Sequence, residues 1–340
     1  MIGPEADSVA GAHREIPPRR RCVSAATYVI AGAGTLSACA GLAARFIPVT
    51  NHATLIAAAM SPYLTVGAAV ACAILLLSRH WWTASAAAVL TAAAVAAQLP
   101  LFVASNQIPG TAIPVRVLTA NVREGTADAT ALATVLRASA DIVAFQELTP
   151  ELVAGLKQQG LDSDFPHQAL APRPGAVGVG VVSRHPIVGS RRIAGYQQGV
   201  VSADIQIPGA AETATLIAAH LSGPWPQPID GWRRDISRFP DTLSEVAARA
   251  GSGAVIVAGD FNATIDMAPF RRLLRDGFHS AAEQAGAGFV RSFPADATIP
   301  PAIGIDHVLT LNSAASRVGT VRIPGSDHLA VLATVNLRAG

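Results

Sequence analysis

The chain has 340 residues, of which 51% are hydrophobic and only 14% are charged. This composition is too apolar for an ordinary soluble enzyme, and the apolar excess is concentrated between positions 23 and 104, where Asp, Glu and Lys do not occur. The formal net charge of +2 comes from the N-terminal part, so positions 105–340 show no basic surplus that would favour binding of long nucleic acids. The cysteines, Cys22, Cys39 and Cys72, all lie in or beside the apolar part, which excludes a disulfide framework and a Cys-based zinc site after position 105.

The chain begins with a basic segment, positions 1–22, followed by three apolar stretches at 23–43, 54–78 and 81–105. Each stretch approaches or exceeds the roughly 20 residues that a helix needs to cross a bilayer. Trp81 and Trp82 stand at the start of the third stretch, where an interfacial aromatic pair is expected. We therefore predict an all-α transmembrane region of three helices over positions 23–105.

The distribution of arginine predicts the orientation of these helices. Arg14 and the run Arg19, Arg20 and Arg21 precede the first stretch, which favours a cytoplasmic N-terminus. Three crossings then place Arg79 on the cytoplasmic side and positions 106–340 outside the cytoplasmic membrane. Arg45 is the exception, because it falls on the outer side.

Two alternatives for this region stay open. The sequence LSAC that ends at Cys39 fits a bacterial lipoprotein cleavage pattern, although small residues that pack between helices explain it equally simply. The three arginines at 19–21 also suggest a twin-arginine signal, although a basic cluster at a membrane boundary accounts for them as well.

After position 115 the pattern changes to short apolar runs separated by turn residues. The expected strands are 115–121, 141–145, 177–183, 202–207, 214–220, 254–259, 304–309, 317–323 and 330–337, and the expected helices are 127–138, 150–159, 229–250 and 267–276. Strands interrupted by helices at irregular intervals predict a layered α/β or α+β domain over 106–340.

Polar side chains collect at the ends of these predicted strands, which we take to be their C-terminal ends. They are Asn121, Glu147, His220, Asp260, Asn262, Asp306, Asp327 and His328. Strand ends and the loops beyond them are where a rigid scaffold presents catalytic groups. Any one of these residues could cap a helix or stabilise a turn, but their joint occurrence predicts one functional site.

The residue types indicate the chemistry. Glu147, Asp260 and Asp327 offer hard carboxylate oxygens, which suit Mg²⁺, with Mn²⁺ as the alternative. Zinc is less expected, because the sequence has no HExxH pair. The absence of a Ser or Cys nucleophile signature favours metal-assisted hydrolysis by water.

Seven segments occur in the order TANVREG, FQELT, GVGVVSRHPI, AAHLSGP, AGDFNAT, IDHVLT and GSDHLAV. Together they resemble the endonuclease/exonuclease/phosphatase superfamily, which includes deoxyribonucleases, abasic-site endonucleases, sphingomyelinases and inositol-phosphate phosphatases. The resemblance covers about positions 115–337 and implies a two-sheet sandwich with helices outside. It also implies that Asn121, Glu147 and Asp327 belong to the metal site, with Glu147 as the principal ligand.

The same resemblance implies roles for the remaining residues. Asp260 and Asn262 would orient the attacking water and a phosphate oxygen. His328 would act as the base or the phosphate-stabilising histidine, with Asp306 as its orienting partner. His220 would be the second histidine that faces the phosphoryl group.

The apolar helices are foreign to the nucleases and resemble those of VanJ-type membrane proteins linked to glycopeptide resistance. We therefore expect a membrane-anchored phosphoester hydrolase whose substrate is a lipid-linked phosphate or pyrophosphate, with no stable nucleic-acid partner. An exported nuclease and a non-catalytic envelope-interaction protein are the alternatives, and the sequence does not indicate the oligomeric state. Trp225 and Trp232, around the turn GPWPQP, would contact lipid or substrate, or pack inside the domain.

Overall fold

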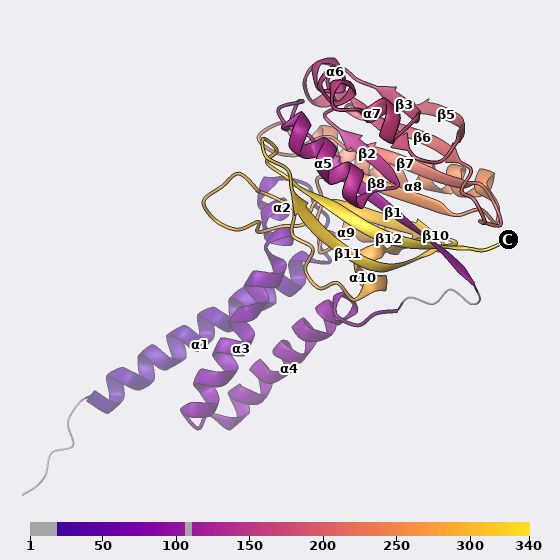
Figure 1. The fold of residues 1–340 in the computed structure, drawn as a ribbon. Helices are drawn as coiled ribbons and strands as arrows, with labels where there is room; N and C mark the ends of the chain where they lie inside the picture. Colours follow the sequence, from indigo (N-terminus) through magenta and orange to yellow (C-terminus); the bar gives the residue numbers. More distant parts are fainter. Residues whose placement is uncertain (1–18, 106–110) are drawn as a thin grey trace, which may run out of the picture.

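The computed structural model describes residues 19–105 and 111–340 (Figure 1). A group of N-terminal helices projects from a layered domain that contains all the strands. Most of the predicted basic segment and the predicted domain boundary at 106 lie outside the described residues. The fold class is confirmed: a two-sheet α/β sandwich flanked by helices follows an all-α region.

Three long helices of the N-terminal region lie side by side (Figure 1). The helices of this region are α1 (Arg19–Ala44), α2 (His52–Ala59), α3 (Ser61–Leu77), α4 (Trp81–Gln98) and the 3-10 turn η1 (Leu99–Leu101). Tyr28 of α1 contacts His80 in the turn between α3 and α4, with 2.9 Å between the Tyr28 hydroxyl and Nδ1. At the other end, the Ser61 hydroxyl donates to the Gly41 carbonyl at 2.8 Å. Helices α1, α3 and α4 therefore alternate in direction, and α2 lies at the end that faces the domain.

The apolar stretch 54–78, predicted as the second of the three helices, is divided by a bend. The chain forms α2 and α3, whose axes are bent by 58° at Met60. Proline lacks an N–H and clashes with the preceding turn of a helix, so Pro62 is tolerated only at the start of α3. Asn51 and Thr54 form a capping box that begins α2.

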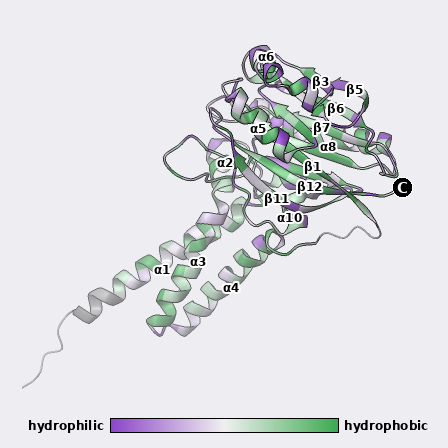
Figure 2. Cartoon of the chain, viewed as in Figure 1, coloured by the Kyte–Doolittle hydropathy of each residue, from purple (hydrophilic) through white to green (hydrophobic). Residues whose placement is uncertain are grey.

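The described helices include two that are long and apolar enough to cross a membrane, Ala25–Ala44 and Trp81–Leu101, or up to three if the bent pair is one span. Figure 2 shows apolar residues along all of them. Helices α1 and α3 meet at Gly34 and Gly67, where a Cβ on Gly34 would lie 2.6 Å from the Gly67 carbonyl oxygen. Such close approach of small residues is typical of helix pairs in membranes. Cys39 lies exposed within α1.

Two six-stranded sheets form the sandwich. The first has the order β11-β12-β1-β2-β4-β3 and the second has the order β5-β6-β7-β8-β10-β9. The strands of the first are β11 (Ala314–Arg322), β12 (Leu329–Arg338), β1 (Ala112–Asn121), β2 (Ile142–Gln146), β4 (Val179–Ser183) and β3 (His167–Ala171). Those of the second are β5 (Ile187–Ile193), β6 (Gly199–Ile205), β7 (Ala214–His220), β8 (Val255–Asp260), β10 (Asp306–Leu311) and β9 (His279–Ser280).

Apolar side chains from both sheets fill the space between them, among them Val117, Val181, Leu216 and Ile256. The helices cover the outer faces. They are α5 (Ala129–Ser139), α6 (Pro150–Gln158) and α7 (Leu161–Asp164) beside the first sheet, and α8 (Asp230–Ala250), α9 (Ala268–Arg271) and η3 (Arg272–Leu274) beside the second. Helix α10 (Ala281–Ala285) instead packs against β11 and β10, one strand from each sheet, and η2 (Gly175–Val177) precedes β4. Trp232 of α8 is fully buried. It therefore packs inside the domain, as one of the two expectations for this residue stated, and does not contact lipid or substrate.

All nine predicted strands are present. Strand β7 has the predicted bounds and the other eight have shifted ends, while β3, β5 and β9 are additional strands. Strands β7 and β8 are buried along their whole length and read as continuous apolar runs. Strand β5 alternates between half-buried and exposed residues and contains Gly189, Arg191 and Arg192, so its apolar signal is weak.

A buried ion pair joins the N-terminal helices to the sandwich. Arg45, directly after α1, pairs with Asp266, and their side chains are only 9% and 4% exposed. Gln98 at the end of α4 donates to the same carboxylate at 2.9 Å. Arg271 of α9 donates to the Arg45 carbonyl. Asp266 therefore fixes the domain-side ends of α1 and α4 together.

We expect Asp266→Ala to lower the free energy of unfolding by about 3–5 kcal/mol, because it leaves the buried charge of Arg45 without a partner. Chemical unfolding of the full chain in detergent micelles measures this. The matched control is Asp230→Ala, which breaks the exposed pair with Arg233 and should cost less than about 1 kcal/mol. Equal losses in the two variants would show that the ion pair does not stabilise the junction.

Candidate active site

Strand register brings the predicted residues to one edge of the sandwich. Asn121 at the end of β1 pairs with Gln146 at the end of the parallel strand β2. His220 at the end of β7 pairs with Asp260 at the end of the parallel strand β8. Asp306 pairs with Asp260 across the antiparallel pair β10 and β8. The two sheets bring these strand ends together, because the side chain of Asn121 in the first sheet donates a hydrogen bond to Asp260 in the second.

The expectation that every site residue follows a strand is wrong for three of them. Asp306 is the first residue of β10, and Asp327 and His328 come directly before β12. Strands β10 and β12 run antiparallel to β8 and β1, so their beginnings lie at the edge where β8 and β1 end.

A cleft of about 660 Å³ opens at this edge. Six of the eight predicted site residues line it: Glu147, His220, Asp260, Asn262, Asp327 and His328. Asn121 and Asp306 do not line the cleft and are both 2% exposed. They contact the lining residues from behind, so all eight belong to one connected group.

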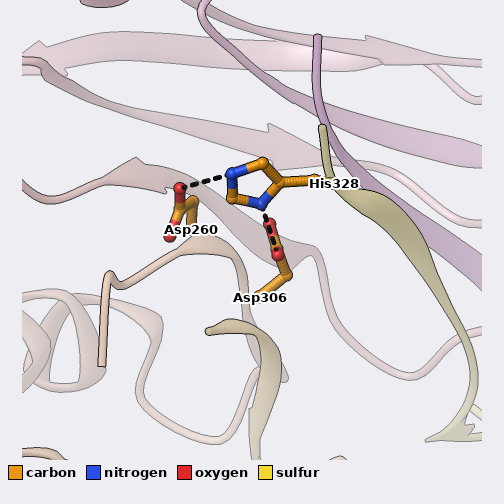
Figure 3. A group of neighbouring side chains, drawn as sticks. All are labelled: Asp260, Asp306 and His328. Atoms are coloured by element: carbon orange, nitrogen blue, oxygen red, sulfur yellow. Dashed lines mark hydrogen bonds and ion pairs between the residues drawn. The ribbon is translucent and has the colours of Figure 1, made fainter. Parts of the chain in front are cut away.

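The imidazole of His328 lies between two carboxylates (Figure 3). Its Nδ1 is 2.8 Å from Oδ2 of Asp306, and its Nε2 is 3.8 Å from Oδ2 of Asp260. Burial disfavours the imidazolium, but the charges of Asp306 and Asp260 outweigh it and raise the pKa of His328 to about 10. His328 is therefore held as a cation that can donate a hydrogen bond into the cleft.

Asp260 has the opposite electrostatic environment. Burial and the neighbouring charge of Asp306 raise the pKa of Asp260 to about 6, although His328 and His220 oppose the shift. Burial lowers the pKa of His220, whose Nδ1 bonds the Ala176 carbonyl at 3.0 Å. A buried carboxylate whose pKa approaches neutrality is a stronger base than an ordinary aspartate.

Asn121 links two of these carboxylates. Its Nδ2 donates to Glu147 and to Asp260, each at 3.0 Å, while its Oδ1 accepts from the Arg123 N–H at 2.9 Å. Glu147 also accepts from the Glu124 N–H at 2.7 Å. Asn121 thus positions Glu147 and Asp260, and its predicted role as a metal-site residue stays a prediction.

Backbone strain gathers at the cleft. Of the seven described non-glycine residues with positive φ, four line it: Arg123, Glu124, Glu147 and Asn262. Asn262 is held by its N–H, which donates to Asp260 at 2.8 Å, and by its Nδ2, which donates to the Leu221 carbonyl at 3.0 Å. Such conformations cost free energy and cluster where structure is fixed for function.

The donor set fits a divalent cation. Glu147 and Asp327 face the same cleft. Burial raises the pKa of Glu147 although the hydrogen bond from Asn121 opposes the shift, and the negative charge of Asp327 adds a small further increase. As an alternative position, ligand atoms of Asp260, Asp306 and His328 all lie within 4.8 Å of one another, which makes this buried cluster a second candidate metal site that requires the His328 imidazole to lose its proton. Oδ1 of Asp306 is buried and has no hydrogen-bond partner among the described residues. A cation would offset this concentration of carboxylates.

Sequence reasoning missed three contributors. The Ser326 hydroxyl accepts from the His328 N–H at 3.0 Å and donates to the Asn121 carbonyl at 2.8 Å, which ties the start of β12 to the end of β1. Arg123, within the motif TANVREG, lines the cleft and pairs with Asp296 at 2.9 Å. Helix α2 contributes Ile56, which no local pattern indicated.

His307, next to Asp306, takes no part in this group. Its Nε2 lies 2.8 Å from the Ala263 carbonyl oxygen, and its ring packs 4.2 Å from that of Phe270. Burial lowers its pKa to about 4, so it is neutral at physiological pH.

The sequence pattern of the Endonuclease/Exonuclease/phosphatase family matches residues 118–328, which is more than half of the chain. No curated protein matches significantly, so the more specific resemblance to VanJ-type proteins stays a prediction. The dyad and the carboxylates of the cleft lie in the matched part, whereas the residues that α2 contributes to the cleft lie outside it.

Solved structures share the fold. An endonuclease/exonuclease/phosphatase from Bacteroides vulgatus is 16% identical with a TM-score of 0.54, and the match covers 66% of this chain and 100% of that one. D. rerio TDP2 complexed with a single-strand DNA product is 17% identical with a TM-score of 0.52, over 66% and 99%. A functionally unknown conserved protein from Enterococcus faecalis is 15% identical with a TM-score of 0.53, over 65% and 98%.

The two candidate cation positions predict different variant phenotypes. If Glu147 is the principal ligand, Glu147→Gln should weaken Mg²⁺ binding by at least about tenfold, because a neutral amide is a poorer ligand for a hard cation. Asp306→Asn should then change the affinity much less. Isothermal titration calorimetry of the full chain with Mg²⁺ and Mn²⁺ measures both.

The control is Glu151→Gln, an exposed glutamate in the first turn of α6, which should bind metal as the wild type does. A large loss in Asp306→Asn with little loss in Glu147→Gln would place the ion in the cluster of Asp260, Asp306 and His328 instead.

Proposed function

The chain belongs to the Endonuclease/Exonuclease/phosphatase family, and from this premise we propose that it is a Mg²⁺-dependent phosphoester hydrolase anchored in a membrane. The observation that carries the proposal is His328, held between Asp306 and Asp260 in the cleft that also contains Glu147 and Asp327. A dyad of this kind beside several carboxylates suits hydrolysis by water. It also disfavours the non-catalytic alternative.

In the proposed reaction, the oxygen of a water molecule attacks phosphorus and the bond between phosphorus and the leaving oxygen breaks. Asp260, whose pKa is raised to about 6, takes the proton of the water. His328 donates a hydrogen bond to a phosphoryl oxygen, and Asp306 fixes its ring. Glu147 and Asp327 would hold the cation, which supplies charge stabilisation at the phosphoryl group.

We expect the purified full chain to hydrolyse a phosphomonoester, phosphodiester or pyrophosphate with Mg²⁺ and to lose this activity in EDTA. His328→Ala should lower turnover by roughly 10²–10⁴ at saturating metal. Asp306→Asn should cost less, because the imidazole stays in place while its orientation and charge are disturbed. A panel of soluble p-nitrophenyl esters and inorganic pyrophosphate measures this.

The matched control is His279→Ala, which changes an exposed histidine in β9 and should keep wild-type turnover. Near-normal turnover of His328→Ala at saturating metal would contradict the assigned role of this histidine.

The arrangement of the helices supports a catalytic domain outside the cytoplasmic membrane. The turn with Arg79 and His80 lies at the end away from the sandwich, next to Tyr28 of α1. Arg45, the exception to the arginine bias, is paired with Asp266 of the sandwich and therefore does not act as a free topological charge. The remaining arginine bias favours a cytoplasmic N-terminus.

Alkaline phosphatase, which is active only after export, tests this orientation. A fusion after Gly340 should be active, and a fusion after Arg79 should be inactive, because the two points lie on opposite sides of the membrane in the proposed topology. The reverse pattern, with activity only after Arg79, would refute the outside location.

For the substrate, we propose a lipid-linked phosphate or pyrophosphate. Among the described residues that line the cleft, Arg123 is the single Lys or Arg, and it is already paired with Asp296. A site for a long polyanion usually presents several unpaired basic side chains. The DNA product bound by D. rerio TDP2 keeps a nuclease as the alternative, and single-stranded DNA belongs in the substrate panel.

A further inference from the structure

The catalytic cleft is built partly from the N-terminal helical region. Leu55, Ile56 and Ala59 of α2 line it together with Trp225 and the catalytic residues. Helix α2 joins the domain-side ends of α1 and α3, so the chain passes directly from the candidate membrane helices into the wall of the cleft. The anchor and the site therefore share an element.

Helix α2 is a fixed part of the domain. Leu55 and Ala58 are 6% and 0% exposed and belong to the apolar core that contains Trp232 and Phe261. This burial orients α2 so that Ile56 and Ala59 line the cleft. Removing the apolar side chain of Leu55 from water favours permanent packing of α2 against the domain.

The first residue of α2 also positions the loop that carries Trp225. Nε2 of His52 lies 2.9 Å from the Pro224 carbonyl oxygen and 3.3 Å from that of Gln227. The His52 ring meets the Trp225 ring edge-on, with 4.8 Å between centroids. Trp225 is 64% exposed although it lines the cleft, so its indole is open to a ligand.

The cleft thus has two chemically distinct parts. One part carries the dyad and the carboxylates. The other is an apolar wall, which we define as Leu55, Ile56, Ala59, Trp225 and Ile303. Ile56 is 53% exposed, and the wall contains no charged side chain. A volume of about 660 Å³ accommodates a phosphate together with several methylene groups.

We propose that this apolar wall binds the hydrocarbon chain of a lipid phosphoester next to its phosphate, and that Ile56 and Trp225 determine specificity for such substrates. The proposal rests on the phosphoester hydrolase function above. A hydrocarbon chain fits the aliphatic side chains of this wall better than a sugar does, because a sugar needs hydrogen-bonding partners that these side chains do not offer. The position of α2 beside the ends of α1 and α3 lets a chain enter from the bilayer surface.

The test uses the full chain in vesicles of digalactosyldiacylglycerol, a lipid without phosphate. Substrates are alkyl phosphates and p-nitrophenyl alkyl phosphates with methyl, butyl and octyl chains. For the ester class that is hydrolysed, we expect kcat/KM of the wild type to rise with chain length by up to about fourfold per methylene while the wall is being covered. Each variant is compared with its own methyl ester.

Ile56→Ser and Trp225→Ala should each flatten this dependence on chain length. Both side chains are largely exposed, so the variants should keep the wild-type unfolding temperature. The matched control is Val188→Ser, which changes a 61% exposed residue of β5 outside the cleft and should keep the wild-type dependence. Partition of the substrate into the vesicle is the same for all variants and cannot produce the difference.

The outcomes separate the two levels of the proposal. Hydrolysis with no rise from methyl to octyl in the wild type, or an unchanged rise in both Ile56→Ser and Trp225→Ala, overturns the role of the apolar wall and leaves the hydrolase function standing. If the wild type hydrolyses no ester of either class and no inorganic pyrophosphate with Mg²⁺ or Mn²⁺, the proposed function fails and the inference fails with it.

Discussion

The site depends on keeping two buried carboxylates and one imidazole in contact. Asp260 and Asp306 are 1% and 2% exposed, so water contributes little to the stabilisation of their charges. The imidazolium of His328 offsets part of this cost, because it lies between them. Losing either carboxylate would remove its contact with His328 and would also change the protonation of the two remaining groups. The three side chains therefore act as a coupled unit.

This contact between three side chains requires an exact strand register at the edge of the sandwich that carries the site. Register between β8 and β10 sets Asp306 opposite Asp260, and a slip of one residue would turn one of them to the other face of the sheet. His328 comes from the other sheet, so its approach depends on how the two sheets pack. Ser326 fixes that approach through its hydrogen bonds to the His328 N–H and the Asn121 carbonyl.

Much of this could be predicted from the sequence, because the information is local. Apolar runs such as those before His220 and Asp260 form central strands in any layered domain, and the polar residues at their ends follow. The break at Met60 also had a local signal in Ser61 and Pro62, which a count of apolar residues alone overlooks.

Other features depend on contacts between distant segments, and no local pattern contains them. Arg45 is an exception to the arginine bias in the sequence, because its partner Asp266 lies more than 200 positions away, in the sandwich. Ile56 reads as one more apolar residue of a membrane stretch, and only the packing of Leu55 in the apolar core that contains Trp232 and Phe261 brings it to the cleft. The apolar signal of strand β5 is weak, so its formation depends on pairing with strand β6 more than on a pattern in its own residues.

These long-range contacts give the N-terminal helices a second effect, because they fix the orientation of the catalytic domain. A tether attached by a flexible linker would only raise the local concentration of the domain near a surface. Here Asp266 binds the ends of α1 and α4, and α2 packs in the core beside Trp232, so the domain is held in one orientation relative to the helices. A flexibly tethered domain would lose rotational freedom when it binds a substrate embedded in a bilayer. A domain held in one orientation has already lost that freedom, so the entropic cost of binding is smaller. The fixed orientation also ties the direction of the cleft to that of the helices, and a substrate that presents its phosphate at the bilayer surface gains most from such an arrangement.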